Sequence, residues 1–151
     1  LDAATSSVPC QMLAEAYINK AAQPNTDTAA YYNKALSCLE QLESRGYATF
    51  AVRQNRAVVL EYLDRFEEAE TVLTDMLADY PYDYRVPMRL ALLYADEAGE
   101  LSDDSARREL YQKVAVNYDA AQQLYDKAAA QDGEMIRLSD LVVQLQNAGW
   151  M

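Results

Sequence analysis

Apolar residues recur every three or four positions along most of this chain, in segments that stop at polar, proline or glycine positions. That spacing places them on one face of an α-helix, and no stretch keeps the strict alternation of a β-strand. The pattern predicts an all-α fold of about seven helices, near 8–22, 27–46, 49–63, 66–79, 84–99, 103–130 and 133–148.

Helix-ending residues fix most of these boundaries. Asp27 suits the N-cap of the second helix and Gly46 its C-terminal end. Pro81 closes the fourth helix, and Asp132 with Gly133 separates the last two. Residues 103–130 are expected to form one long helix, with a kink near Asn117 as the alternative.

Paired in order, the helices form three hairpins, about 8–46, 48–81 and 84–131, followed by a capping helix at about 133–148. A hairpin of this length cannot bury its apolar face alone, whereas stacked hairpins share one core. We therefore expect a single domain over residues 1–151, with the last helix shielding the open end of the stack.

Part of this pattern repeats at a fixed interval. The positions of Arg56, Ala57 and Leu60 correspond to those of Leu90, Ala91 and Tyr94, each displaced by the same number of residues along the chain. Between the two copies stand Ala69, Leu73, Met76 and Pro81, which mark a second helix with a proline stop. A period of about 34 residues indicates stacked helical repeats, and such repeats usually bind other molecules rather than catalyse reactions.

With Ala57 and Ala69 at its close-approach positions and Pro81 at its stop, the middle hairpin resembles the tetratricopeptide repeat. The resemblance implies a right-handed α-α superhelix. The third hairpin fits with an insertion of about five helical turns between Tyr94 and Ala121. Leu13 of the first hairpin corresponds to Arg56 of the second, and the distance between them along the chain is longer than the repeat period. The chain is therefore expected to be a divergent three-repeat domain.

The resemblance also implies a concave groove, lined by the first helix of each hairpin, that holds a peptide or a partner segment. The residues expected to bind the partner are Gln54, Asn55, Val58 and Tyr62 from the second hairpin and Arg85, Met88, Arg89 and Leu92 from the third. Flanking positions of the same groove are Gln11, Glu15, Ile18, Asn19, Glu61 and Asp96.

One subgroup of the family grips a C-terminal carboxylate with basic and amide residues, and Asn55, Arg85 and Arg89 match three of its positions. Gln11 and Glu15 occupy the other two, and the carboxylate of Glu15 would repel the ligand. Two arginines one turn apart could still hold an anion. The favoured alternative is that they neutralise neighbouring acids such as Asp83.

Twelve tyrosines stand out in the composition. Tyr17, Tyr32, Tyr94, Tyr118 and Tyr125 lie on helix faces at core spacing, so packing explains them best. Tyr62, on the expected groove, is the tyrosine that we expect to contact a partner.

Charge and composition exclude several functions. The net charge is −11, which repels nucleic acid and anionic membranes, so neither is an expected partner. Histidine is absent, and with it the commonest acid-base group and transition-metal ligand. No phosphate loop, nucleophile elbow or calcium loop occurs. We expect no enzyme activity, no cofactor, no metal site and no catalytic residue.

The two cysteines, Cys10 and Cys38, are expected to be free core thiols. They stand equally far from Pro24 in the first hairpin turn, one on each side, so a disulfide, which would indicate an oxidising compartment, is the alternative. No run of about 20 apolar residues could span a membrane. The chain begins at Leu1, which suggests a segment cut from a longer extracytoplasmic or membrane-tethered protein.

These observations favour a non-enzymatic interaction module that binds a protein or peptide, as a monomer or weak homodimer. The rival hypothesis is a structural spacer, an oligomerisation module or a regulatory sensor domain of a larger protein. In the oligomerisation case, the last helix or Trp150 would dock onto a second copy.

Overall fold

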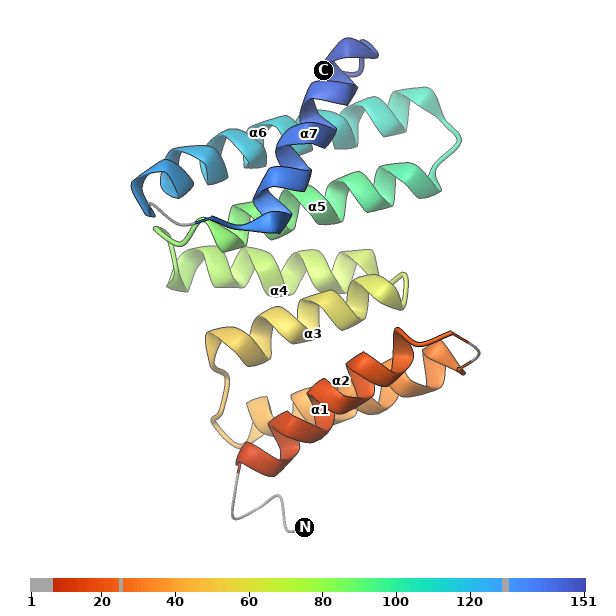
Figure 1. Cartoon of the computed structure of the whole chain (residues 1–151), viewed down its shortest axis with the longest axis vertical. Helices are drawn as coiled ribbons and strands as arrows, with labels where there is room; N and C mark the ends of the chain where they lie inside the picture. The colour runs from red at the N-terminus through yellow and green to blue at the C-terminus, as the bar shows by residue number, and fades with distance from the viewer. Residues whose placement is uncertain (1–6, 25, 129–130) are drawn as a thin grey trace. The chain divides into compact units, whose positions relative to one another are not determined.

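The computed structural model describes residues 7–24, 26–128 and 131–151, which form seven α-helices and no strand (Figure 1). The prediction of an all-α fold with about seven helices is confirmed. The helices are α1 Ser7–Ala21, α2 Thr28–Ser44, α3 Phe50–Tyr62, α4 Phe66–Asp79, α5 Arg85–Glu100, α6 Asp104–Ala128 and α7 Gly133–Asn147.

Short polar side chains begin the helices where the sequence predicts. Asp27 accepts a hydrogen bond from the backbone N–H of Ala30 at 3.1 Å and caps α2. Asp132 caps α7 by accepting from the N–H of Glu134. Gly46 follows α2 with a φ of +86°, a conformation that glycine adopts without steric cost. These local contacts explain why the helix boundaries could be read from the sequence.

The chain divides into two compact units, Leu1–Thr74 and Asp75–Met151, with the boundary inside α4. We refer to them as unit 1 and unit 2. One repeat domain over residues 1–151 stays a prediction of the sequence pattern.

Unit 1 is built on the antiparallel hairpin of α1 and α2, with α3 packed against α2. Arg56 of α3 forms an ion pair with Glu43 of α2 at 2.8 Å. The charge of Arg56 therefore has a partner on the neighbouring helix. The buried apolar side chains of the three helices include Ala14, Tyr32, Ala35, Leu36, Leu39, Leu42, Val52, Ala57, Val59 and Leu60.

In unit 2, α5 and α6 form a hairpin, and α7 packs against both (Figure 1). Every residue of α5 from Val86 to Tyr94 is buried. A helix buried all round is covered on more than one side, and α7 supplies part of that cover. α7 contributes Met135, Leu138, Val142 and Leu145 to the core of the unit.

The long helix α6 runs without interruption from Asp104 to Ala128. It passes through Asn117, whose side chain donates a hydrogen bond to the carbonyl of Lys113 at 2.9 Å, on the preceding turn. The expectation of one long helix is confirmed as far as Ala128. The expected last two residues, 129–130, lie outside the described part of the chain.

Candidate functional site

Four of the predicted partner-binding residues share one side of α3 in unit 1. Gln54, Asn55 and Val58 are half-buried, and Tyr62 is 58% exposed. Steps of three and four residues bring their side chains onto neighbouring turns of the same helix surface. We call this set, Gln54, Asn55, Val58 and Tyr62, the α3 face.

Tyr62 stacks on Tyr32 of α2. The two ring centroids lie 5.0 Å apart, and the ring planes differ by 9°. Tyr32 is only 5% exposed, and burial, followed by the proximity of Tyr62, raises the pKa of its hydroxyl. One surface of the Tyr62 ring therefore rests on a buried, neutral tyrosine, while more than half of the side chain remains accessible.

The predicted site residues on α5 are mostly inaccessible. Met88 is 1% exposed, Leu92 is 6% exposed and Arg89 is 8% exposed. The guanidinium of Arg89 pairs with Glu134 of α7. The expectation that these three residues line an open groove does not fit this structure, because unit 2 covers the helix that carries them.

Arg85 is already paired. Its Nε and Nη2 atoms donate to the two carboxylate oxygens of Asp83 at 2.9 and 2.6 Å. This hydrogen-bonded guanidinium holds the pKa of Asp83 below its usual value. The alternative interpretation, that Arg85 neutralises Asp83, is confirmed. Arg89 forms its ion pair with Glu134. The two arginines therefore do not form an open anion site.

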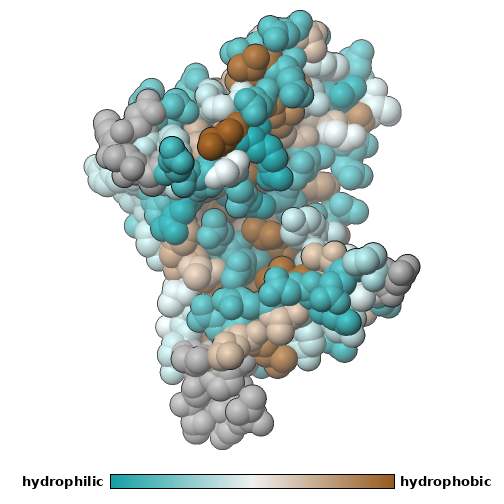
Figure 2. Space-filling view, in the orientation of Figure 1, coloured by the Kyte–Doolittle hydropathy of each residue, from teal (hydrophilic) through white to brown (hydrophobic). Residues whose placement is uncertain are grey.

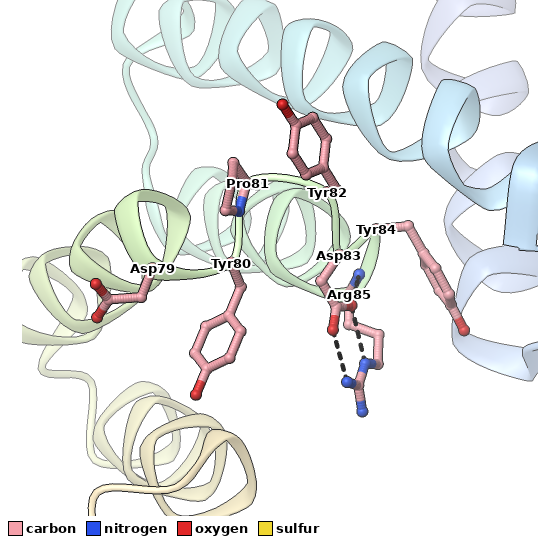
Figure 3. Close-up of a pocket in the computed structure, with 7 residues that line it drawn as sticks. All are labelled: Asp79, Tyr80, Pro81, Tyr82, Asp83, Tyr84 and Arg85. Atoms are coloured by element: carbon pink, nitrogen blue, oxygen red, sulfur yellow. Dashed lines mark hydrogen bonds and ion pairs between the residues drawn. The ribbon is translucent and has the colours of Figure 1, made fainter.

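Unit 2 carries a cavity of about 510 Å³ at the turn between α4 and α5. Its lining is one continuous segment, Asp79, Tyr80, Pro81, Tyr82, Asp83, Tyr84 and Arg85. Figure 3 shows the rings of Tyr80 and Tyr82 pointing to opposite sides of the turn, with Asp83 and Arg85 joined by their two contacts. The sequence pattern predicts no cavity here, although three tyrosines, Tyr80, Tyr82 and Tyr84, flank Pro81.

Trp150, a candidate for docking onto a second copy, packs within its own unit. The guanidinium carbons of Arg107 and Arg108 lie 4.5 and 5.2 Å from its ring centroid. The Tyr111 ring meets it edge-on with centroids 5.2 Å apart. All of these contacts are with α6. They cover parts of the Trp150 ring that the oligomerisation hypothesis needs for contact with a second copy.

The visible surface over α7 is mostly hydrophilic, with isolated hydrophobic spots (Figure 2). The exposed large apolar residues of α7 are Ile136 and Val143, which are 54% and 53% exposed. Scattered apolar residues of this kind are normal on the surface of a monomer. They give the oligomerisation hypothesis little support.

The described residues hold neither a metal centre nor a membrane-spanning helix. No cluster of three or more His, Cys, Asp or Glu side chains there is arranged to hold a metal ion. No helix in the described ranges has the length and apolar character needed to cross a membrane. The α3 face is the candidate functional surface, because it presents the ring of Tyr62, which is exposed yet stacked on Tyr32.

Comparison of the chain with known protein families, with curated proteins and with solved structures finds no match.

Proposed function

We propose that this chain is a non-enzymatic protein-interaction module that binds an extended or helical peptide on the α3 face. The observation that carries the proposal is Tyr62, which is 58% exposed yet stacked on buried Tyr32. An aromatic ring that is held in place before binding loses little conformational freedom when a partner packs on it. Tyrosine is also enriched among the residues that dominate binding energy at interfaces.

The chemistry of the α3 face suits a peptide. Gln54 and Asn55 each carry a carboxamide that can donate to and accept from a peptide backbone. Val58 and the ring of Tyr62 supply apolar contact beside them. Because the chain carries a net charge of −11, the surrounding field favours a peptide that is neutral or basic.

A tetratricopeptide-like right-handed superhelix is the architecture that we propose to present this surface. It is supported by the order and lengths of the seven helices and by the repeat interval between Ala57 and Ala91. It is further supported by the complete burial of Ala69, which allows the close helix approach that the repeat requires.

A peptide library displayed on phage, selected against the purified chain, tests the binding function. A synthetic peptide from the selection would be measured by calorimetry against the wild type and the Tyr62→Ala and Asn55→Ala variants. We expect each variant to weaken binding by about tenfold or more, which corresponds to about 1.4 kcal/mol.

Tyr82→Ala is the matched control, because Tyr82 is 87% exposed but belongs to unit 2. It should leave the affinity unchanged. If selected peptides bind Tyr62→Ala as tightly as the wild type, or if Tyr82→Ala weakens them equally, the α3 face is not the binding surface.

A further inference from the structure

The hairpin of α1 and α2 has a register that two independent contacts define. The hydroxyl of Thr28 donates to the carbonyl of Ala21 at 3.2 Å, where the two helices meet at the turn. One turn further from the loop, the rings of Tyr17 and Tyr31 lie 6.1 Å apart. Each step of three or four residues back along α1 is therefore matched by a similar step forward along α2.

Continuing this register brings Ala14 opposite Ala35, and then Cys10 opposite Cys38. To within one residue, Cys10 lies as far before the end of α1 as Cys38 lies after the start of α2. At a rise of about 1.5 Å per residue, the two positions differ in height by only about 1.5 Å. Both cysteines continue the stripe of positions through which the two helices face each other.

The same part of the hairpin allows close approach. Ala14 and Ala35 have no exposed surface, and Cys10 is 5% exposed. Small side chains at a helix interface let the helix axes come near the lower end of the usual range of about 8 to 10 Å. Facing Cα atoms then fall near the separation of about 4.4 to 6.8 Å that a disulfide spans.

Cys38 lies close enough to Cys10 for its thiol to be affected by it. Burial, followed by the proximity of Cys10, raises the pKa of the Cys38 thiol. Both thiols are free in this structure. The effect of Cys10 on Cys38 agrees with the register, which places the two side by side between the two helices.

We propose that Cys10 and Cys38 are a modification site, a dithiol pair that closes into an intramolecular disulfide linking α1 to α2. The oxidant is a small-molecule disulfide such as oxidised glutathione. The Cys38 thiolate attacks it, forms a mixed disulfide and releases one glutathione thiolate. The Cys10 thiolate then attacks Sγ of Cys38 and releases the second glutathione, so two thiols are oxidised and one disulfide is reduced.

Cys38 is the first nucleophile because it is half-buried, whereas Cys10 is buried. Its raised pKa lowers the thiolate fraction at neutral pH, which makes the exchange slow. The pair is therefore suited to a lasting structural link, in contrast to the exposed, low-pKa thiols of rapid redox sensors.

The test is refolding of the reduced, urea-unfolded chain in a glutathione redox buffer, so that access to the buried thiols does not limit the reaction. Intact mass spectrometry should show a monomer that has lost two hydrogen atoms. Peptide mapping without reductant should identify a link between the peptides that contain Cys10 and Cys38. Thermal unfolding should shift upward by several degrees and return to its original position after reduction.

Cys10→Ser and Cys38→Ser are the matched controls, and each should take up one glutathione or none and show no upward shift. The proposal is overturned if the refolded wild type remains a dithiol, carries glutathione on each cysteine, or forms disulfide-linked dimers. Because the wild type alone yields each of these results, the outcome does not depend on whether the serine variants fold.

Discussion

Tyr84, at the start of α5, donates its hydroxyl hydrogen to the carboxylate of Asp132, 48 residues further along the chain, at 2.8 Å. The same Asp132 caps α7 by accepting from the N–H of Glu134, and its own N–H donates to the hydroxyl of Tyr125 on α6, both at 2.9 Å. The rings of Tyr84 and Tyr125 meet edge-on with centroids 5.0 Å apart. One aspartate therefore connects α5, α6 and α7.

Replacement of Tyr84 by phenylalanine removes this hydrogen bond and keeps the ring. We expect Tyr84→Phe to lower the free energy of unfolding by about 1 to 3 kcal/mol, because the acceptor is charged. Urea unfolding followed by circular dichroism measures the change. Tyr82→Phe is the control, because an 87% exposed side chain should change stability by no more than about 0.5 kcal/mol. Equal stabilities of the two variants would contradict the coupling.

The same contact predicts a dependence on pH. Burial, followed by the hydrogen bond to Asp132, raises the pKa of Tyr84 to about 12, whereas an unfolded tyrosine titrates at about pH 10. The folded state holds the proton more tightly, so this stabilisation is complete below about pH 10 and is lost as the pH rises towards about 12.

Comparison of the wild type with Tyr84→Phe isolates this effect, because the two proteins share all other tyrosines. The difference between their free energies of unfolding should be constant near neutral pH and shrink in the alkaline range. A difference that stays constant through that range would show that Tyr84 titrates normally.

Sequence patterns predicted the features of this fold that depend on neighbouring residues. Asp27 as an N-cap, Gly46 as a helix end and the continuity of α6 through Asn117 all follow from local hydrogen bonding and backbone conformation. The apolar spacing predicted the number of helices for the same reason, since the period of the pattern is a property of each segment alone.

Residues whose surroundings come from distant segments were not predictable in this way. Arg89 was expected on an open groove, but it pairs with Glu134, 45 residues away, because α7 packs on α5. The stacking of Tyr62 on Tyr32 likewise depends on how α3 meets α2. A repeat pattern indicates which side of a helix faces the partner, but it does not indicate which later helix covers that side.

Replacement of two glycines by alanine should change the stability of the protein in opposite directions. Gly149 ends α7 with a φ of +79°, where an added Cβ would meet no atom but the backbone conformation would be strained. Gly149→Ala should therefore lower stability by about 1 to 2 kcal/mol. Gly99 lies within α5 and also has open space, so Gly99→Ala should raise stability by about 0.5 to 1 kcal/mol. Thermal unfolding of both variants gives the signs, and changes in the same direction would refute the argument.

The stacked rings of Tyr32 and Tyr62 should show measurable energetic coupling. We expect a double-mutant cycle of Tyr32→Leu and Tyr62→Leu to give a favourable interaction of about 0.5 to 1.5 kcal/mol beyond the separate effects. Tyr62→Phe should retain that coupling, because the stacked ring is unchanged. A coupling near zero would mean that the exposed ring is not held in place, which removes the main support for its role in binding.

Replacement of Trp150 distinguishes packing within one chain from docking onto a second copy. Its contacts with Arg107, Arg108 and Tyr111 combine two cation-π interactions with an aromatic pair, so Trp150→Ala should lower stability by about 2 kcal/mol. Because these contacts are intramolecular, sedimentation at several protein concentrations should give the same mass for wild type and variant. The fluorescence of this single tryptophan should also be independent of concentration. A wild-type dimer that Trp150→Ala converts to a monomer would instead support the oligomerisation hypothesis.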